Sequence, residues 1–121
     1  MINKLISTLL ASRTQAQIFH WQTMDDSSNA KHLALGAYYE DIADLVDGLV
    51  ESYQGRYGII KGYEGPQTFR EDDNQIIYFK GLSKYVETVR SSIPQDSYVQ
   101  NQIDEIVGLI ETTLYKLQNL H

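Results

Sequence analysis

The chain has 121 residues, no cysteine and a net charge of −6. This length suits one domain over residues 1–121. Without cysteine, disulfide bonds and thiolate metal ligands are excluded, so any metal would have to be held by His, Asp and Glu. The ten Lys and Arg residues are scattered between Lys4 and Lys116. This disfavours direct nucleic-acid binding, because phosphate neutralisation needs clustered cations.

No apolar run approaches the roughly 20 residues that span a bilayer. The sequence MINKLISTLLASRT at the start lacks the small-residue cleavage site of a secretory signal. We therefore expect a cytoplasmic protein with no membrane partner.

Apolar side chains recur at helical spacing through residues 2–22, without Gly or Pro, which predicts a first helix. The run Asp25-Asp26-Ser27-Ser28 then offers N-cap side chains for a second helix over about residues 29–53. On a helical wheel of that segment, the apolar side chains gather on one side. A polar group lies roughly opposite and is expected to face away from the bundle core: His32, Glu40, Asp44, Asp47 and Glu51.

Residues 54–73 contain four of the eight glycines and one of the two prolines, which predicts a long connection. Its apolar side chains, Tyr57, Ile59, Ile60, Tyr63 and Phe69, suggest that it docks on its own bundle or on a partner subunit.

A third helix is expected over about residues 73–92 and a fourth over about 97–120. Pro94 stands in the turn between them, and Asp96 or Ser97 can cap the fourth helix. The expected buried face of the third helix comprises Ile76, Ile77, Phe79, Leu82, Tyr85, Val86 and Val89. That of the fourth comprises Val99, Ile103, Ile106, Val107, Ile110, Leu114, Leu117 and Leu120.

Four helices with two short turns and one long connection predict an all-α, antiparallel four-helix bundle of the ferritin-like kind. No segment shows the alternating pattern of a strand.

One set of polar residues resembles a known motif. His20 is followed twelve residues later by His32, and Asp47 and Glu51 then form a D-x-x-x-E pair. This spacing is similar to the ferroxidase motif of the mini-ferritins, the DNA-binding proteins from starved cells (Dps). The resemblance implies that His20 and His32 come from one subunit and Asp47 and Glu51 from its two-fold mate. It also implies iron as the bound metal and a homodimer or larger homo-oligomer formed through the second helix.

The chain departs from the Dps pattern at three points. A further acidic ligand is expected four residues after the second histidine, where this chain has Gly36, and Glu40 is a candidate replacement one turn on. The small helix between the second and third helices and the basic tail for DNA are also missing. The short chain and reduced ligand set are similar to Dps-like proteins encoded by tailed phages.

Imidazole and carboxylate together bind iron(II), and carboxylates offset the added charge of iron(III). Three or four such ligands also suit zinc. We therefore expect a metal site with weak or no iron oxidation. The alternative is an inert helical bundle that serves as an interaction or structural module, for example a phage adaptor. In that reading His20 caps its helix, His32 is solvated, and the carboxylates form an ordinary wet face.

Overall fold

Four α-helices make up most of the computed structural model, which describes residues 1–23, 29–72 and 74–120. They are α1 (Ile2–Gln22), α2 (Asn29–Tyr57), α3 (Gln75–Val89) and α4 (Ser97–Asn119). A short 3-10 turn, η1 (Arg90–Ser92), follows α3. Within these ranges there is no strand, so the all-α prediction is confirmed.

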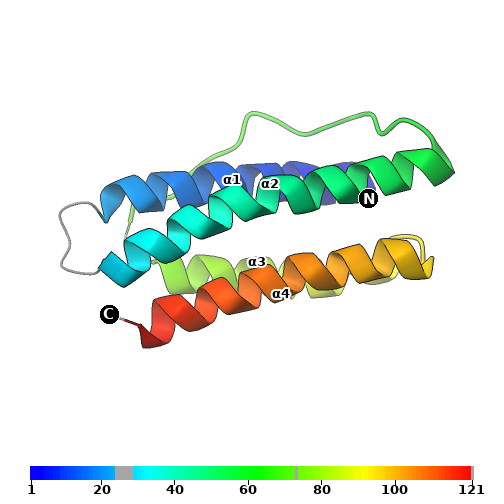
Figure 1. Ribbon diagram of the computed structural model, residues 1–121. Coiled ribbons are helices and arrows are strands. Elements are labelled where there is room, and N and C mark those ends of the chain that lie inside the picture. Colours follow the sequence, from blue (N-terminus) through cyan, green and yellow to red (C-terminus); the bar gives the residue numbers. More distant parts are fainter. Residues whose placement is uncertain (24–28, 73, 121) are drawn as a thin grey trace.

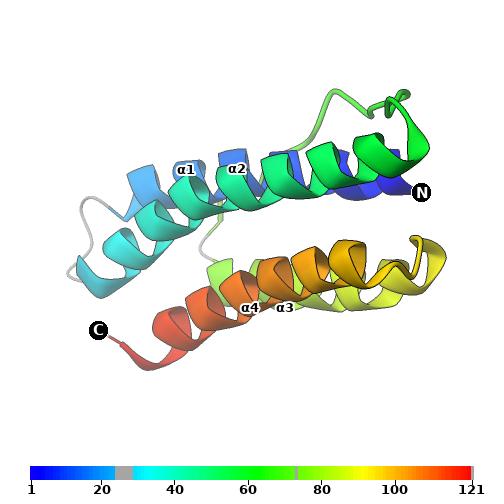
Figure 2. The same cartoon turned by 45° about the vertical axis from the view of Figure 1, so that its right-hand side comes forward.

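The helices form two layers, α1 beside α2 and α3 beside α4 (Figure 1, Figure 2). The closest neighbours are α1 with α2, α2 with α4, and α4 with α3, whereas α1 and α3 make sparser contact. Each layer is an antiparallel pair, but α2 and α3 run in the same direction (Figure 1). Residues 58–74 must therefore cross from one end of the bundle to the other. The structure thus has the predicted arrangement of four helices with one long connection.

The core draws side chains from all four helices, and Phe19, Tyr38 and Phe79 are its largest fully buried members. The Tyr38 and Phe79 rings meet edge to face with centroids 5.0 Å apart. Ser12 Oγ donates to Leu9 O at 2.7 Å, so the Tyr38 hydroxyl donates to Ser12 Oγ, also at 2.7 Å. Burial raises the pKa of Tyr38. The buried hydroxyl is thus protonated and paired, as a polar group in a core must be.

The helix ends differ from the predictions where backbone geometry outweighs composition. α2 continues through Gly55 and ends at Tyr57; the next residue, Gly58, has a φ of +94°, which suits glycine just after a helix C-terminus. Gly58 N donates to Gln54 O at 2.9 Å. α3 is shorter than expected because its last turn tightens into η1.

The predicted capping of α4 by a side chain is wrong. Asp96 occupies the N-cap position but makes no side-chain capping bond. Its carboxylate instead accepts a hydrogen bond from the Tyr57 hydroxyl at the end of α2. The other predicted cap, on residues 25–28, lies outside the described residues.

The connection 58–74 docks on α1 of its own bundle. Glu64 N donates to Ser7 Oγ at 2.8 Å. Gln15 makes a reciprocal pair with Arg70, donating from Nε2 to Arg70 O at 2.9 Å and accepting from Arg70 N at 2.7 Å. Of the apolar side chains expected to dock, Ile60 is buried and Phe69 is half-buried, whereas Tyr57, Ile59 and Tyr63 are exposed.

The expected core is correct except at a few positions. Ile77 on α3 is 58% exposed and Leu120, just after α4, is 42% exposed. Val107 and three members of the α3 face, Ile76, Leu82 and Tyr85, are partly or fully buried as expected. The exposure of Ile77 reflects the sparse contact between α1 and α3.

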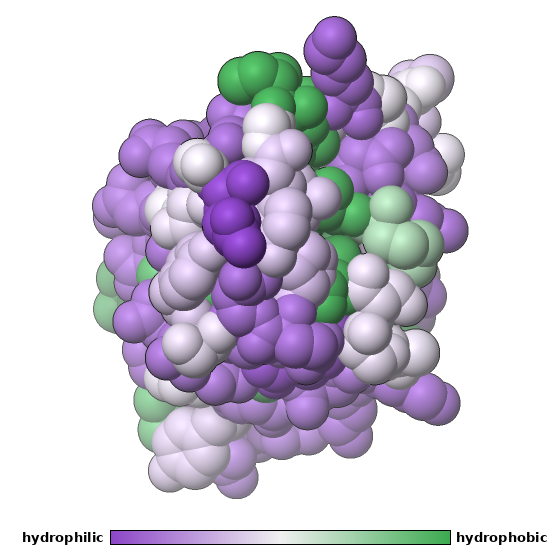
Figure 3. Space-filling model, turned by 90° about the vertical axis from the view of Figure 1, so that its right-hand side faces the viewer, coloured by the Kyte–Doolittle hydropathy of each residue, from purple (hydrophilic) through white to green (hydrophobic). Residues whose placement is uncertain are grey.

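The end of the bundle where α1 begins and α2 ends has a largely hydrophilic surface (Figure 3). There Arg56 Nε lies 3.9 Å from Asp96, and Arg90 Nη2 lies 2.6 Å from Asp104. No described helix is long and apolar enough to cross a membrane.

Candidate metal site

The structure brings His20 and His32 together, although twelve residues separate them in the chain. His20 lies in the last turn of α1 and His32 in the first turns of α2. Their rings stack with centroids 3.7 Å apart and an angle of 18° between planes. The antiparallel packing of α1 on α2 sets this approach, and both side chains are half-buried.

Each histidine is oriented by the main chain of the other. His20 Nδ1 lies 2.7 Å from His32 O, and His32 Nδ1 lies 3.1 Å from His20 O. Because a carbonyl oxygen only accepts, both Nδ1 atoms carry the proton and donate. In the neutral rings, the lone pair then resides on Nε2. This is the arrangement of metal-binding histidines, in which the second nitrogen is fixed by a main-chain carbonyl or a carboxylate.

Thr23, just after α1, adds a further contact to this pair. Its hydroxyl donates to His20 O at 2.9 Å and lies 3.3 Å from His32 Nδ1. Thr23 thus contacts one carbonyl and one imidazole of the histidine pair. Sequence reasoning missed Thr23, and its position directly after the His20 helix was the available signal.

Gly36 has a structural role that the resemblance to the Dps motif did not indicate. A Cβ atom at Gly36 would lie 3.2 Å from His20 Cε1 and 3.4 Å from His20 Nδ1. The imidazole of His20 therefore packs directly against the backbone of α2. It also meets the Tyr39 ring edge to face, with centroids 5.4 Å apart. On this backbone any side chain at position 36 would require the His20 ring to shift by a few tenths of an ångström.

Glu40 shares an open surface pocket of about 420 Å³ with His20. Gly36 and Tyr39 also line this pocket, and Glu40 is exposed at its edge. The fold thus brings Glu40 to the same pocket as His20 of its own chain.

Asp47 and Glu51 lie far from the histidines of their own chain. At 1.5 Å per residue, they stand about 22 Å and 28 Å beyond His32 along α2. Both are exposed, as are Glu40 and Asp44, so the predicted outward acidic face of α2 is confirmed. Within the described part of one chain, no three His, Asp or Glu side chains gather closely enough to hold a metal ion.

Apolar side chains flank the histidine pair on the surface. Trp21, next to His20, is 59% exposed, and Leu33, next to His32, is 61% exposed. Trp21 is therefore not a core residue of a single chain.

The fold and this pair of oriented histidines define a helical-bundle protein with two imidazoles at one end and an acidic outer helix face. Residues 20–117 match a family of unknown function, DUF5856, and the chain belongs to that family. The matched region begins at His20 and includes all of α2 and α3. Neither the curated proteins nor the solved structures gave a match.

Proposed function

We propose that this protein is a ferritin-like, Dps-like metal-binding protein with a reduced site shared between two subunits. His20 and His32 of one copy would bind the ion together with Asp47 and Glu51 of a second copy. The observation that supports the proposal is the reciprocal Nδ1–carbonyl pairing, which leaves Nε2 of each imidazole as the nitrogen that would bind an ion.

A second copy must supply the carboxylates because Asp47 and Glu51 lie too far along α2 to reach the histidines of their own chain. If two α2 helices pack antiparallel about a two-fold axis, His32 of one copy comes opposite Asp47 and Glu51 of the other when the axis lies beside residues 40–41. Such an interface is isologous, so one contact forms two equivalent sites. Glu40 then lies close to the axis.

The residues present fit iron(II) or zinc(II). Two neutral imidazoles and two carboxylates make a mixed nitrogen and oxygen donor set that either ion accepts. When bound, iron(II) would itself be oxidised to iron(III) by dioxygen or peroxide, whereas zinc(II) would undergo no redox chemistry. The chain's own contribution is to fix the imidazoles through His20 O and His32 O and to offset positive charge with Asp47 and Glu51. With Gly36 in place of a further carboxylate, we propose weak or no iron oxidation.

Subunit complementation tests the shared site. One variant carries His20→Ala with His32→Ala, and the other carries Asp47→Asn with Glu51→Gln. Each alone should lose zinc(II) binding by calorimetry, because neither can form a complete site. Unfolded together and refolded in equal amounts, they should regain about a quarter of the wild-type sites, since random pairing makes half of the dimers mixed, with one intact site each. Failure of the mixture to bind, with both variants folded, would contradict the shared site.

Disulfide cross-linking tests the position of the axis. Since the chain has no cysteine, Glu40→Cys introduces a lone thiol next to the proposed axis. Oxidation should give a covalent dimer in high yield. The matched control is Glu105→Cys, also an exposed helical glutamate, on α4. Equal cross-linking of the two variants would argue against pairing through α2.

The second candidate is an inert interaction module, favoured by the exposed Trp21 and Leu33 beside the histidines. It predicts that a chelator does not change the oligomer size of the wild type, measured by light scattering. It also predicts that the variant with both His20→Ala and His32→Ala has the same oligomer size as the wild type. The metal-site proposal predicts that both treatments weaken the assembly.

A further inference from the structure

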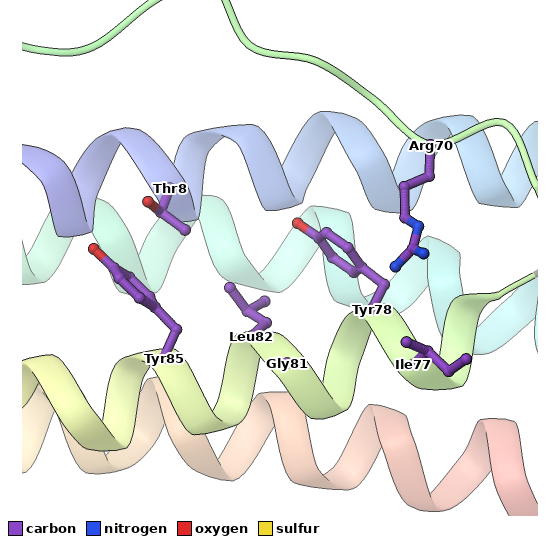
Figure 4. A pocket seen from close by; sticks show the side chains of 7 residues that line it. All are labelled: Thr8, Arg70, Ile77, Tyr78, Gly81, Leu82 and Tyr85. Carbon is purple, nitrogen blue, oxygen red and sulfur yellow. The ribbon is translucent and has the colours of Figure 1, made fainter.

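A second pocket lies between α1 and α3, on a part of the molecule that the proposed metal site does not use. It has a volume of about 380 Å³, within the range of small-molecule sites. Tyr78, Leu82 and Tyr85 of α3 supply most of its wall, and Thr8 of α1 faces them (Figure 4). Ile77, which is 58% exposed, lies at its edge. The sparse contact between α1 and α3 leaves this groove open.

Arg70 brings a positive charge to one end of the groove. Its backbone is held to Gln15 by two hydrogen bonds, and its side chain descends from the connection toward α3 (Figure 4). Arg70 Nε lies 3.5 Å from the half-exposed Asp72 carboxylate. A guanidinium offers five N–H donors, so a single contact through Nε leaves donors that suit a second carboxylate.

The charges along the groove favour an anion. α1 contains no Asp or Glu at all, and Lys4 stands one turn before Thr8. On α3 the one carboxylate, Glu87, pairs with Arg90 at 2.9 Å. This side of the molecule therefore differs from the acidic outer face of α2.

The tyrosines add hydrogen-bond donors to apolar walls. Both hydroxyls point toward α1 (Figure 4). Burial raises the pKa of Tyr78, so its hydroxyl stays protonated. The Tyr85 hydroxyl is buried and has no hydrogen-bond partner among the described residues.

Gly81 lies on the wall of the groove at the middle of α3. A glycine inside a helix costs about 1 kcal/mol relative to alanine. At Gly81 an added Cβ would meet no atom within 4 Å, so no packing of the chain itself requires the missing side chain. Gly81 itself is one of the residues that line the groove.

We propose that this groove binds a small carboxylate with an apolar body. The carboxylate pairs with the Arg70 guanidinium, and the apolar body lies against Tyr78, Leu82 and Tyr85. This site is independent of the proposed metal site, which uses the histidine pair and the outer face of α2.

The test uses 2-naphthoate and its neutral analogue 2-naphthamide as probes, with calorimetry for affinity and amide NMR for location. Naphthoate should bind the wild type at least about 10-fold more tightly than naphthamide, because a charged hydrogen-bond partner is worth about twice a neutral one. Its shift changes should centre on Thr8, Tyr78 and Tyr85. Arg70→Gln should remove the preference for the carboxylate while the Gln15 contact to the Arg70 backbone holds the loop in place.

Two glycine variants separate filling of the groove from general effects on the helices. Gly81→Leu should reduce naphthoate affinity more than about 10-fold, because the side chain occupies the space of the ligand. The control is Gly108→Leu on α4, where an added Cβ also meets no atom within 4 Å. It should bind naphthoate like the wild type. Circular dichroism confirms that both variants fold.

The proposal is overturned if naphthoate fails to bind the folded wild type, or binds no better than naphthamide. It is equally overturned if shift changes lie away from the groove, or if Gly81→Leu and Gly108→Leu bind alike.

Discussion

Replacement of Gly36 by alanine measures how closely His20 packs on α2. In an open helical position, Gly→Ala stabilises by about 0.5–1 kcal/mol, and Gly108→Ala on α4 should show this full gain. At Gly36 the new Cβ would lie 3.2 Å from His20 Cε1, closer than the roughly 3.5–4.0 Å of a favourable carbon contact. The gain and the strain therefore act in opposite directions.

His20 has little freedom to move away from that Cβ. The ring is stacked on His32 at 3.7 Å and bonded to His32 O at 2.7 Å. Displacing it would weaken a hydrogen bond worth about 1 kcal/mol, which cancels the helix-propensity gain. We expect Gly36→Ala to change the free energy of unfolding by about zero, roughly 1 kcal/mol less favourable than Gly108→Ala.

Urea unfolding of the two variants gives this difference, with linear extrapolation for each. The NMR signals of the His20 and His32 ring protons provide a second readout, because unstacking changes the ring-current shift. If Gly36→Ala gained as much stability as Gly108→Ala and left both ring signals unchanged, the close packing of His20 on α2 would be refuted.

Three further variants test contacts that hold the bundle together. Tyr38→Phe should destabilise by about 1 kcal/mol, and a double-mutant cycle with Ser12→Ala should assign this loss to their 2.7 Å hydrogen bond; additive effects would contradict that assignment. Gln15→Leu should leave Arg70 N and O without their partner and raise amide exchange at Arg70, whereas Gln17→Leu should not. The hydrogen bond from the Tyr57 hydroxyl lowers the pKa of Asp96 below its ordinary 3.8. This contact therefore contributes its full stabilisation of the folded state above pH 3.8, and the contribution is lost as the pH falls through the lowered pKa. Wild type and Tyr57→Phe should therefore differ in stability at neutral pH and converge in acid; a difference independent of pH would exclude the carboxylate as the cause.

Periodicity predicted most of the fold because the apolar spacing is strong along all four helices. The bounds of α1 agree with the prediction, and α4 ends one residue earlier than expected. The end of α2 was misplaced because glycine composition alone does not show which glycine takes a positive φ, here Gly58. Ile77 was assigned to the core because the spacing within one helix cannot show how closely its neighbour packs.

The candidate metal site was predictable only in part. The wheel placed Asp47 and Glu51 on an outer face, and the structure agrees. The stacking of His20 on His32 and the carbonyl contacts of both rings depend on the three-dimensional approach of α1 to α2. The resemblance to Dps marked Gly36 as the place of a missing ligand, whereas the structure shows that the His20 ring packs closely against this glycine. Binding by a second copy is a prediction that the assembly experiments must decide.

Two of the contacts that hold the long connection on α1 enclose a short exposed segment. Between Glu64, held by Ser7, and Arg70, held by Gln15, the chain carries exposed residues at 65–68. Doubling the length of a flexible loop costs only about 0.6 kcal/mol of closure entropy. An epitope tag or a fluorescent peptide inserted after Gln67 should thus leave the helices undisturbed. This position offers a way to label the protein without touching either the histidine pair or the outer face of α2.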